Sequence, residues 1–242
     1  MLKRYLILLP IFGTLAFPTM ANDAFDKKVE EYLMQNPDVL GRALENMQNY
    51  YAQEEEKRVQ QTILDNADEL YKSTRDFTLG PDDATVTIVE FFEYNCGYGK
   101  RAFPSLMKVV EENDDVRVVF KEFPILSENS RTAASYALAL NDQLKFLTFH
   151  SKLMSSRGSV NPAFLERTLK EIGADVDTVK ARAKDSKIDD TLNKTEALAK
   201  TLGINGTPAF VINNQLYPGA LSEDRLQQII AAARTDKAKT TN

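Results

Sequence analysis

The sequence predicts an α/β domain that carries a helical insertion and follows a long helical arm. Three observations lead to this fold class. Residues 37–71 have the apolar spacing of a helix, with no proline after the first position. A near-continuous apolar strand at 86–92, a helix at 96–112 and a second strand at 116–123 then form a βαβ unit. Residues 127–202 are almost wholly helical in pattern and precede a final ββα segment.

The first 21 residues have the composition of a cleavable export signal. Lys3 and Arg4 precede an apolar stretch at 5–17, and we expect cleavage after Ala21, so that 1–21 is the signal peptide. A membrane anchor is disfavoured, because prolines and a glycine interrupt a stretch too short to span a bilayer comfortably. We therefore expect a periplasmic protein, free or associated with the envelope.

The composition excludes several classes of function. Without Lys3 and Arg4, the chain has 28 basic and 35 acidic residues, a net charge of −7, so we expect no nucleic-acid partner. One cysteine allows no internal disulfide. No cluster has metal-ligand spacing and no glycine loop could cradle a phosphate, so we expect no metal and no cofactor. His150 is interpreted as a surface or packing residue.

The arm is predicted at residues 22–74. A short helix at 25–35 precedes a long one, which the Asn36-Pro37-Asp38 sequence can start. This long helix either packs on its own domain or forms an oligomerisation arm through residues 25–72. We favour the arm, because a long amphipathic helix before the core has little of its own fold to cover. Its apolar stripe comprises Leu40, Leu44, Met47 and Tyr51 and, after the charged run at 54–58, Val59, Ile63, Ala67 and Leu70.

The α/β domain that follows the arm is predicted to extend from residue 75 to residue 234. Breaks near Asn141, at 158–162, at Gly173 and near Lys187 divide the insertion at about 127–202 into four or five helices, and Gly203 would end the last one. The final segment is expected to contain, in order, a strand at 209–212, a turn at Asn213-Asn214, a strand at 215–217, a helix at 222–233 and a disordered tail at 235–242.

Cys96 is the predicted centre of the chemistry. A lone cysteine is usually a small buried hydrophobic residue. This one stands where a buried strand ends and a helix begins, so it faces the free N–H groups of the first helical turn. Such a setting stabilises thiolates. Gly97 and Gly99 would let another chain approach the sulfur closely.

The sequence resembles the DsbA-like thioredoxin-fold family over about residues 75–233. With the helical arm, the likeness is greatest to the oligomeric suppressor-of-copper-sensitivity (ScsC) proteins. The resemblance implies a thioredoxin fold and disulfide exchange. It rests on Cys96-Gly97-Tyr98 after a strand with Phe91-Phe92, on Lys100-Arg101, on the helical insertion and on Gly206-Thr207-Pro208.

The resemblance also implies roles for four further residues. Thr207-Pro208 matches the cis-proline loop, whose exposed backbone would pair with a substrate strand beside the sulfur. Glu90 and Lys121 match a charged pair beneath the active site, which would tune the pKa of the thiol and relay its proton. A structural ion pair is the alternative for Glu90 and Lys121.

Gly99 departs from the family pattern, because the second cysteine is missing. One nucleophile can hold a mixed disulfide and be displaced by another thiol, which fits an isomerase or a monothiol reductase. The implied partners are proteins with disulfides or thiols, with a membrane thiol reductase or glutathione as redox partner. A Cys96–Cys96 bond between protomers is a further option. The competing hypothesis is a non-catalytic, chaperone-like protein that retains the peptide groove.

Overall fold

The computed structural model describes residues 23–240, so the signal expected at 1–21 lies outside the described residues. The chain divides into two compact units, and the boundary falls between Gln53 and Glu54. Within the described residues, no helix is long and apolar enough to cross a membrane.

The first unit contains α1 (Asp23–Gln35) and the first part of α2 (Pro37–Asp65). The two helices meet at Asn36, whose side-chain amide donates to the backbone oxygen of Tyr32 at 2.8 Å. Large apolar side chains on both helices are exposed, although apolar surface of this extent is normally buried. They are Phe25, Val29, Tyr32, Met34, Leu40, Leu44, Met47, Tyr50 and Tyr51.

The second unit begins inside α2 and includes the short helix α3 (Ala67–Tyr71). The sequence predicted one helix up to Tyr71, but the helix is interrupted at Asn66. Ile63 and Leu70 are fully buried in a cluster with strand residues of the sheet. The predicted start of the domain at residue 75 is therefore too late, because the preceding turns contribute to its core.

A five-stranded mixed sheet forms the centre of the second unit, in the order β1-β3-β2-β4-β5. β2 and β3 are parallel, as the predicted βαβ unit requires, and the other pairs are antiparallel. β1 was not predicted, because three residues carry too little pattern without their partner strand. The strands are β1 (Phe77–Leu79), β2 (Val86–Phe92), β3 (Val116–Glu122), β4 (Ala209–Ile212) and β5 (Gln215–Pro218).

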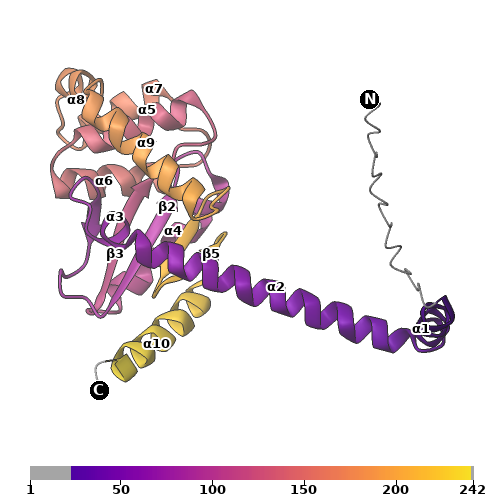
Figure 1. Cartoon of the computed structure of the whole chain (residues 1–242). Helices are drawn as coiled ribbons and strands as arrows, with labels where there is room; N and C mark the ends of the chain where they lie inside the picture. Colours follow the sequence, from indigo (N-terminus) through magenta and orange to yellow (C-terminus); the bar gives the residue numbers. More distant parts are fainter. Residues whose placement is uncertain (1–22, 241–242) are drawn as a thin grey trace, which may run out of the picture. The chain divides into compact units, whose positions relative to one another are not determined.

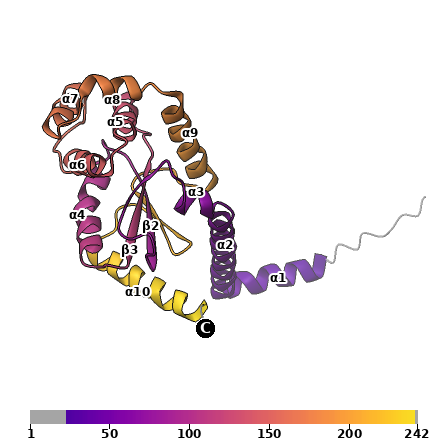
Figure 2. The same ribbon diagram turned by 90° about the vertical axis from the view of Figure 1, so that its left-hand side faces the viewer.

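Helices cover both faces of the sheet (Figures 1 and 2). On the α4 face lie α4 (Gly97–Glu111), α10 (Glu223–Thr240) and helices of the insertion, which share one apolar cluster with the strands. On the α3 face lie α3, α9 and Ile63 of α2, in a second cluster. The predicted fold class is confirmed: a thioredoxin-like sheet with a helical insertion, preceded by a helical region.

The insertion contains five helices, and most of their predicted boundaries agree with the structure. Asn141, Gly173 and Gly203 have positive φ angles of 43°, 67° and 75°, which Gly and Asn adopt at low cost after a helix. An acceptor side chain caps the start of each helix. The helices are α5 (Glu128–Ala139), α6 (Gln143–Met154), α7 (Pro162–Glu171), α8 (Val176–Arg182) and α9 (Ser186–Thr201).

The C-terminal helix is longer than predicted. α10 runs from Glu223 to Thr240. It therefore extends past the predicted end at 233 and into the segment 235–242, which was predicted to be disordered. No proline or glycine interrupts this segment, and Arg234 forms an ion pair with Asp115 at 2.5 Å, so the helix continues past the predicted end. Residues 241 and 242 lie outside the described part of the chain.

Candidate active site

Cys96 is the N-cap of α4, at the point where the segment after β2 enters the helix. Its Sγ accepts a hydrogen bond from the backbone N–H of Gly99 at 3.4 Å. The thiol also lies 3.0 Å from the backbone oxygen of Thr207, to which its S–H donates. The residue is 5 % exposed. One sulfur is thus held between a helix N-terminus and a loop 111 positions away in the chain.

Gly99 is buried, and the structure retains room for a side chain there. A Cβ added to Gly99 would lie 3.7 Å from the Cβ of Cys96, 4.0 Å from its Sγ and 3.5 Å from Cε of Met154. The Cβ–Cβ separation in disulfides averages about 3.8 Å. The backbone therefore has the geometry of a two-cysteine motif, although it provides one thiol.

The loop facing Cys96 contains a cis peptide bond between Thr207 and Pro208. The backbone oxygen of Pro208 accepts from the N–H of Gly219 at 2.8 Å, which ties the loop to the end of β5. The Oγ1 atom of Thr207 is buried and has no hydrogen-bond partner among the described residues. A hollow of about 310 Å³ adjoins this loop, lined by residues 203–209 together with Leu216, Pro218 and Gly219.

Glu90 and Lys121 do not form the expected pair. Successive side chains of a strand point to opposite faces. Glu90 alternates with Val89 and Phe91 of the α3-face cluster and is therefore on the α4 face. Lys121 lies beside Phe91 in the parallel register and is therefore on the α3 face. The sheet separates the two residues, and the predicted pair is wrong.

Lys121 instead binds the segment around α3. Its Nζ donates to Oδ2 of Asp76 and to the backbone oxygen of Glu69, each at 2.5 Å. The side chains of Lys121 and Asp76 are 1 % and 3 % exposed, so this is a buried ion pair. Burial raises the pKa of Asp76, and the charge of Lys121 acts in the opposite direction. Lys121 thus holds α3 and the start of β1 against the sheet.

The α4 face carries buried acids instead of a cation. Both carboxyl oxygens of Glu90 lack a hydrogen-bond partner in the described structure, and burial raises its pKa to about 8. The hydroxyl of Tyr94 donates to Oε1 of Glu122 at 2.7 Å. Burial also raises the pKa of Glu122 well above its usual range. Burial thus favours the protonated form of both carboxyl groups.

His150 is a packing residue, and it is buried rather than on the surface. Its Nδ1 lies 3.3 Å from the hydroxyl of Tyr94, and the rings of Phe92 and Phe120 are each centred 4.7 Å from its own. Burial lowers the pKa of His150 to about 3, so the ring is neutral at physiological pH. The buried Tyr94, Glu122 and His150 together form a hydrogen-bonded polar cluster in the apolar core.

Asn95 and Lys100, for which the sequence predicted no structural role, hold the insertion against the motif. Oδ1 of Asn95 accepts from the N–H of Val160 at 2.6 Å. Nζ of Lys100 donates to the hydroxyl of Ser156 at 2.9 Å and to the oxygen of Gly158 at 2.8 Å. No sequence signal connects these positions to the loop at 155–161, because the contacts span about 60 residues of chain.

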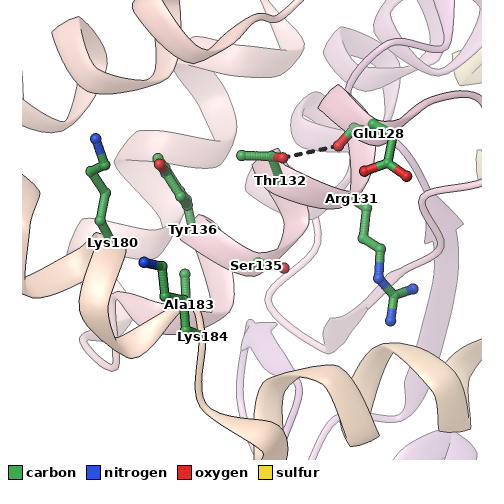
Figure 3. Close-up of a pocket in the computed structure, with 8 residues that line it drawn as sticks. All are labelled: Glu128, Arg131, Thr132, Ser135, Tyr136, Lys180, Ala183 and Lys184. Atoms are coloured by element: carbon green, nitrogen blue, oxygen red, sulfur yellow. Dashed lines mark hydrogen bonds between the residues drawn. The ribbon is translucent and has the colours of Figure 1, made fainter.

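A second pocket, of about 320 Å³, lies between α5 and α8 of the insertion and includes no residue of the motif (Figure 3). Two of its charged side chains form ion pairs: Arg131 with Asp189, and Lys180 with Glu166 at 2.8 Å. The hydroxyl of Thr132 donates to the backbone oxygen of Glu128, as the dashed line shows. We therefore place the candidate site at Cys96 and not in this pocket.

Solved structures resemble the chain over most of its length. A thioredoxin-like oxidoreductase from Silicibacter pomeroyi is 36% identical, with a TM-score of 0.67, over 69% of this chain and 97% of that one. ScsC from Proteus mirabilis, in a transitional conformation, is 31% identical with a TM-score of 0.68 over 89% of this chain and 97% of that one.

Among curated proteins, Disulfide bond formation protein D of Bacillus subtilis is 26% identical over 164 residues, which is 63% of this chain and 74% of that protein. The first curated relatives are Na⁺/H⁺ antiporters, and the chain spans about a quarter of their length. The model of the DSBA-like thioredoxin domain matches residues 87–231, more than half of the chain. The chain therefore belongs to the DSBA-like thioredoxin domain family.

Proposed function

We propose that this chain is a periplasmic thiol–disulfide exchange protein that acts on disulfide-containing proteins through one nucleophile, Cys96. The observation that carries the proposal is the placement of Sγ at the N-terminus of α4, where it accepts from the N–H of Gly99, while position 99 provides no second sulfur. Helix N-termini are a common setting for reactive cysteines. Because position 99 provides no second sulfur, another thiol must release the substrate.

Rearrangement of substrate disulfides by Cys96 needs no net oxidant or reductant. The Cys96 thiolate attacks a substrate disulfide, a new S–S bond forms to Sγ, and the electron pair of the broken bond leaves on the other substrate sulfur. A substrate thiolate or a small thiolate then attacks the mixed disulfide and releases Cys96 as a thiolate. The cycle rearranges disulfides when the second thiol belongs to the substrate. When it is external, that thiol ends in a mixed disulfide with the substrate, and a second external thiol must attack this bond to complete the reduction.

Substrate backbone would pair beside the cis-proline loop. The oxygen of Thr207 lies 3.0 Å from Sγ, so a strand placed along this loop would bring its own disulfide to the nucleophile. We include Gly97, Tyr98 and Gly99 in the site, with Thr207 and Pro208 as substrate-binding residues. Glu90 remains a candidate for tuning the thiol through its buried carboxyl group, whereas Lys121 has no part in this role.

A second candidate function is a non-catalytic peptide-binding or chaperone-like protein. The contact between the S–H of Cys96 and the oxygen of Thr207 favours it, because the thiol already serves as a hydrogen-bond donor to its own chain. The two candidates differ in the rate at which iodoacetamide alkylates Cys96 across pH. A working nucleophile reacts faster than a free cysteine peptide at neutral pH, and a retained structural thiol reacts more slowly.

The test of the first candidate uses a scrambled disulfide protein without added thiol. We expect Cys96 mixed disulfides that survive on non-reducing gels, that glutathione discharges and that Cys96→Ser abolishes. Gly99→Cys should shorten their lifetime and allow Cys96 to form a disulfide with the introduced thiol, because the 3.7 Å Cβ separation at this position suits that bond. If the wild type forms no adducts and Cys96 is alkylated slowly, thiol–disulfide exchange is contradicted and the non-catalytic peptide-binding function is favoured.

We further propose that the chain is a homo-oligomer, assembled through residues 25–72. The exposed apolar side chains of α1 and the first part of α2 support this, since a second copy can cover them. Removal of residues 22–53 should give a folded monomer in light scattering. Removal of 22–72 should instead destabilise the domain, because it deletes Ile63 and Leu70 from the core. A full-length monomer at micromolar concentration would contradict the assembly.

A further inference from the structure

The helix that begins at Cys96 has an unfavourable distribution of charge. Its first turn contains no acidic residue, and Lys100 and Arg101 lie near this end. The peptide dipoles give a helix a positive N-terminus, which disfavours cations there. A local conflict of this kind is expected where a charge serves binding or chemistry.

Arg101 lies directly on the active-site motif. Its Cζ is 4.4 Å from the centroid of the Tyr98 ring, and its Nη1 is 3.6 Å from the position of a Cβ on Gly97, the residue after Cys96. Tyr98 is 65 % exposed, so the stacked pair is accessible to a ligand. No ion pair recorded for the described residues includes Arg101. Its positive charge is therefore available beside the thiol.

The loop at 155–161, which contains Arg157, is held against the motif by Lys100. Lys100 binds Ser156 and Gly158, which are the two neighbours of the exposed Arg157. The partners of Lys100 are neutral oxygens, so its charge is not cancelled by a hydrogen-bonded carboxylate. Arg157 also has no carboxylate partner within the part of the chain that the structure describes. The start of α4 and the loop at 155–161 thus bring cationic residues into the same region, which we call the rim.

The acid that acts on this rim, Glu93, is buried. Glu93 is 1 % exposed, and its Oε1 accepts from the N–H of Asn95 at 2.5 Å. Burial lowers the pKa of Lys100, and the charge of Glu93 acts in the opposite direction. Burial raises the pKa of Glu93 itself, so it offsets less positive charge than an exposed carboxylate would. The chain as a whole has a net charge of −5, so this positive rim is a local feature that attracts anions.

We propose that Lys100, Arg101 and Arg157 bind the carboxylates of a small anionic peptide thiol, glutathione, while its sulfur exchanges with Cys96. The inference rests on the proposed function and specifies the external thiol that completes the cycle. Guanidinium groups suit this task, because their planar N–H donors match carboxylate geometry. Gly99 provides no competing thiol, so a second sulfur must come from outside the chain.

The steps balance in atoms and electrons. The Cys96 thiolate attacks the glutathionyl sulfur of a protein–glutathione mixed disulfide; the S–S bond breaks, and its electron pair leaves on the protein sulfur. Cys96 then carries the glutathionyl group. A second glutathione thiolate attacks that sulfur, forms glutathione disulfide and releases Cys96 as a thiolate. Glutathione is oxidised and the protein disulfide is reduced, with no other electron acceptor.

The experiment compares three disulfides of different charge on the reduced full-length chain: glutathione disulfide, which is anionic, hydroxyethyl disulfide, which is neutral, and cystamine, which is cationic. The rate of Cys96 adduct formation is measured by mass spectrometry and divided by the rate of a free-cysteine peptide. We expect the normalised rate to be highest for glutathione disulfide and lowest for cystamine. Added salt should remove the difference.

Arg101→Gln and Arg157→Gln should each lower the normalised rate for glutathione disulfide about twofold to fivefold, the range for a single exposed charge pair. The value compared is the ratio of the glutathione disulfide rate to the hydroxyethyl disulfide rate in the same variant, so that an effect on the thiol itself cancels. The matched control is Arg167→Gln on α7, which removes the same charge from a similar stack, with Cζ 5.1 Å from the centroid of Phe164. This control should leave all three rates unchanged.

The outcomes separate this inference from the function on which it rests. Equal normalised rates for the three disulfides, or an equal loss in Arg167→Gln, would overturn the rim and leave exchange by Cys96 intact. The glutathione site would also be overturned, with exchange by Cys96 intact, if Cys96 reacted faster with disulfides of peptides that have acidic residues beside the cysteine than with glutathione disulfide. If no disulfide reacts faster with Cys96 than with the free peptide, the proposed function fails, and the rim fails with it.

Discussion

The two faces of the sheet differ in whether their buried ionisable side chains have partners of opposite charge. On the α3 face, Lys121 has an acid partner in Asp76 and a backbone oxygen at Glu69, each at 2.5 Å. On the α4 face, Glu90 has no partner among the described residues, and Tyr94 provides one hydroxyl to Glu122. The side chains on both faces are almost fully buried.

The difference shows how a protein can retain ionisable groups in its core. A buried charge persists where a counter-charge and hydrogen bonds compensate for lost hydration, and otherwise the group becomes neutral. Lys121 and Asp76 follow the first route. Glu90, Glu122 and His150 follow the second, as the directions of their pKa shifts indicate. The two faces should therefore respond differently to substitution and to pH.

The largest effect is expected on the α3 face. Lys121→Met leaves the carboxylate of Asp76 buried without a cation, and we expect a loss of about 3–5 kcal/mol in the free energy of unfolding. The measurement is urea unfolding at neutral pH. Lys180→Met serves as control, because its bridge to Glu166 is 43 % and 36 % exposed, and it should lower the free energy of unfolding far less than Lys121→Met does. Equal losses in the two variants would contradict a buried pair.

Glu90→Gln should change the pH dependence of stability on the α4 face. A folded pKa of about 8, against 4.5 in the unfolded chain, means that Glu90 prefers its protonated form in the fold. Its favourable contribution is complete below pH 4.5 and is lost as pH rises to about 8, by up to about 4 kcal/mol. The wild type should thus lose stability over this range relative to Glu90→Gln.

The control for Glu90 is Glu196→Gln, an exposed position on α9. Unfolding curves at several pH values give the slope directly, so a constant penalty from the buried amide does not disturb the result. Parallel pH profiles for the wild type and Glu90→Gln would mean that Glu90 is ionised in the fold.

His150 should produce the opposite slope at lower pH. Its pKa is about 3 in the fold and 6.5 in the unfolded chain, so protons bind the unfolded state preferentially between these values. Wild-type stability should fall as pH decreases through this window, by about 2 kcal/mol at pH 5. His150→Phe should remove that loss. Thermal unfolding of both proteins from pH 7 to pH 4 checks this, and an unchanged acid slope in the variant would exclude a neutral buried imidazole.

Tyr94→Phe is expected to have the smallest effect. It removes the donor to Oε1 of Glu122 while the ring remains in place, so we expect a loss of about 1–2 kcal/mol. The control is Tyr136→Phe, whose hydroxyl has no hydrogen bond recorded among the described residues and which should change stability by less than about 0.5 kcal/mol. Urea unfolding resolves the two, and a neutral Tyr94→Phe would indicate that water replaces the missing donor.

The site was partly predictable from the sequence. Cys96 stood out because the apolar run before it and the helical pattern after it are local signals, and both correspond to elements in the structure. Thr207-Pro208 was singled out by its resemblance to a family motif. Glu90 and Lys121 were singled out in the same way, but their pairing was wrong, since matching residue types does not establish the face on which each side chain lies.

The sequence by itself determined the order and type of most elements, because periodicity, caps and turn residues act within a few positions of the chain. Only the tertiary structure decided which buried groups meet. The register of β2 and β3 separates Glu90 from Lys121, and the fold brings Asp76 to Lys121 across 45 positions. It likewise brings Thr207 to Cys96 across 111 positions. Such contacts depend on long-range strand pairing and packing, which local patterns do not encode.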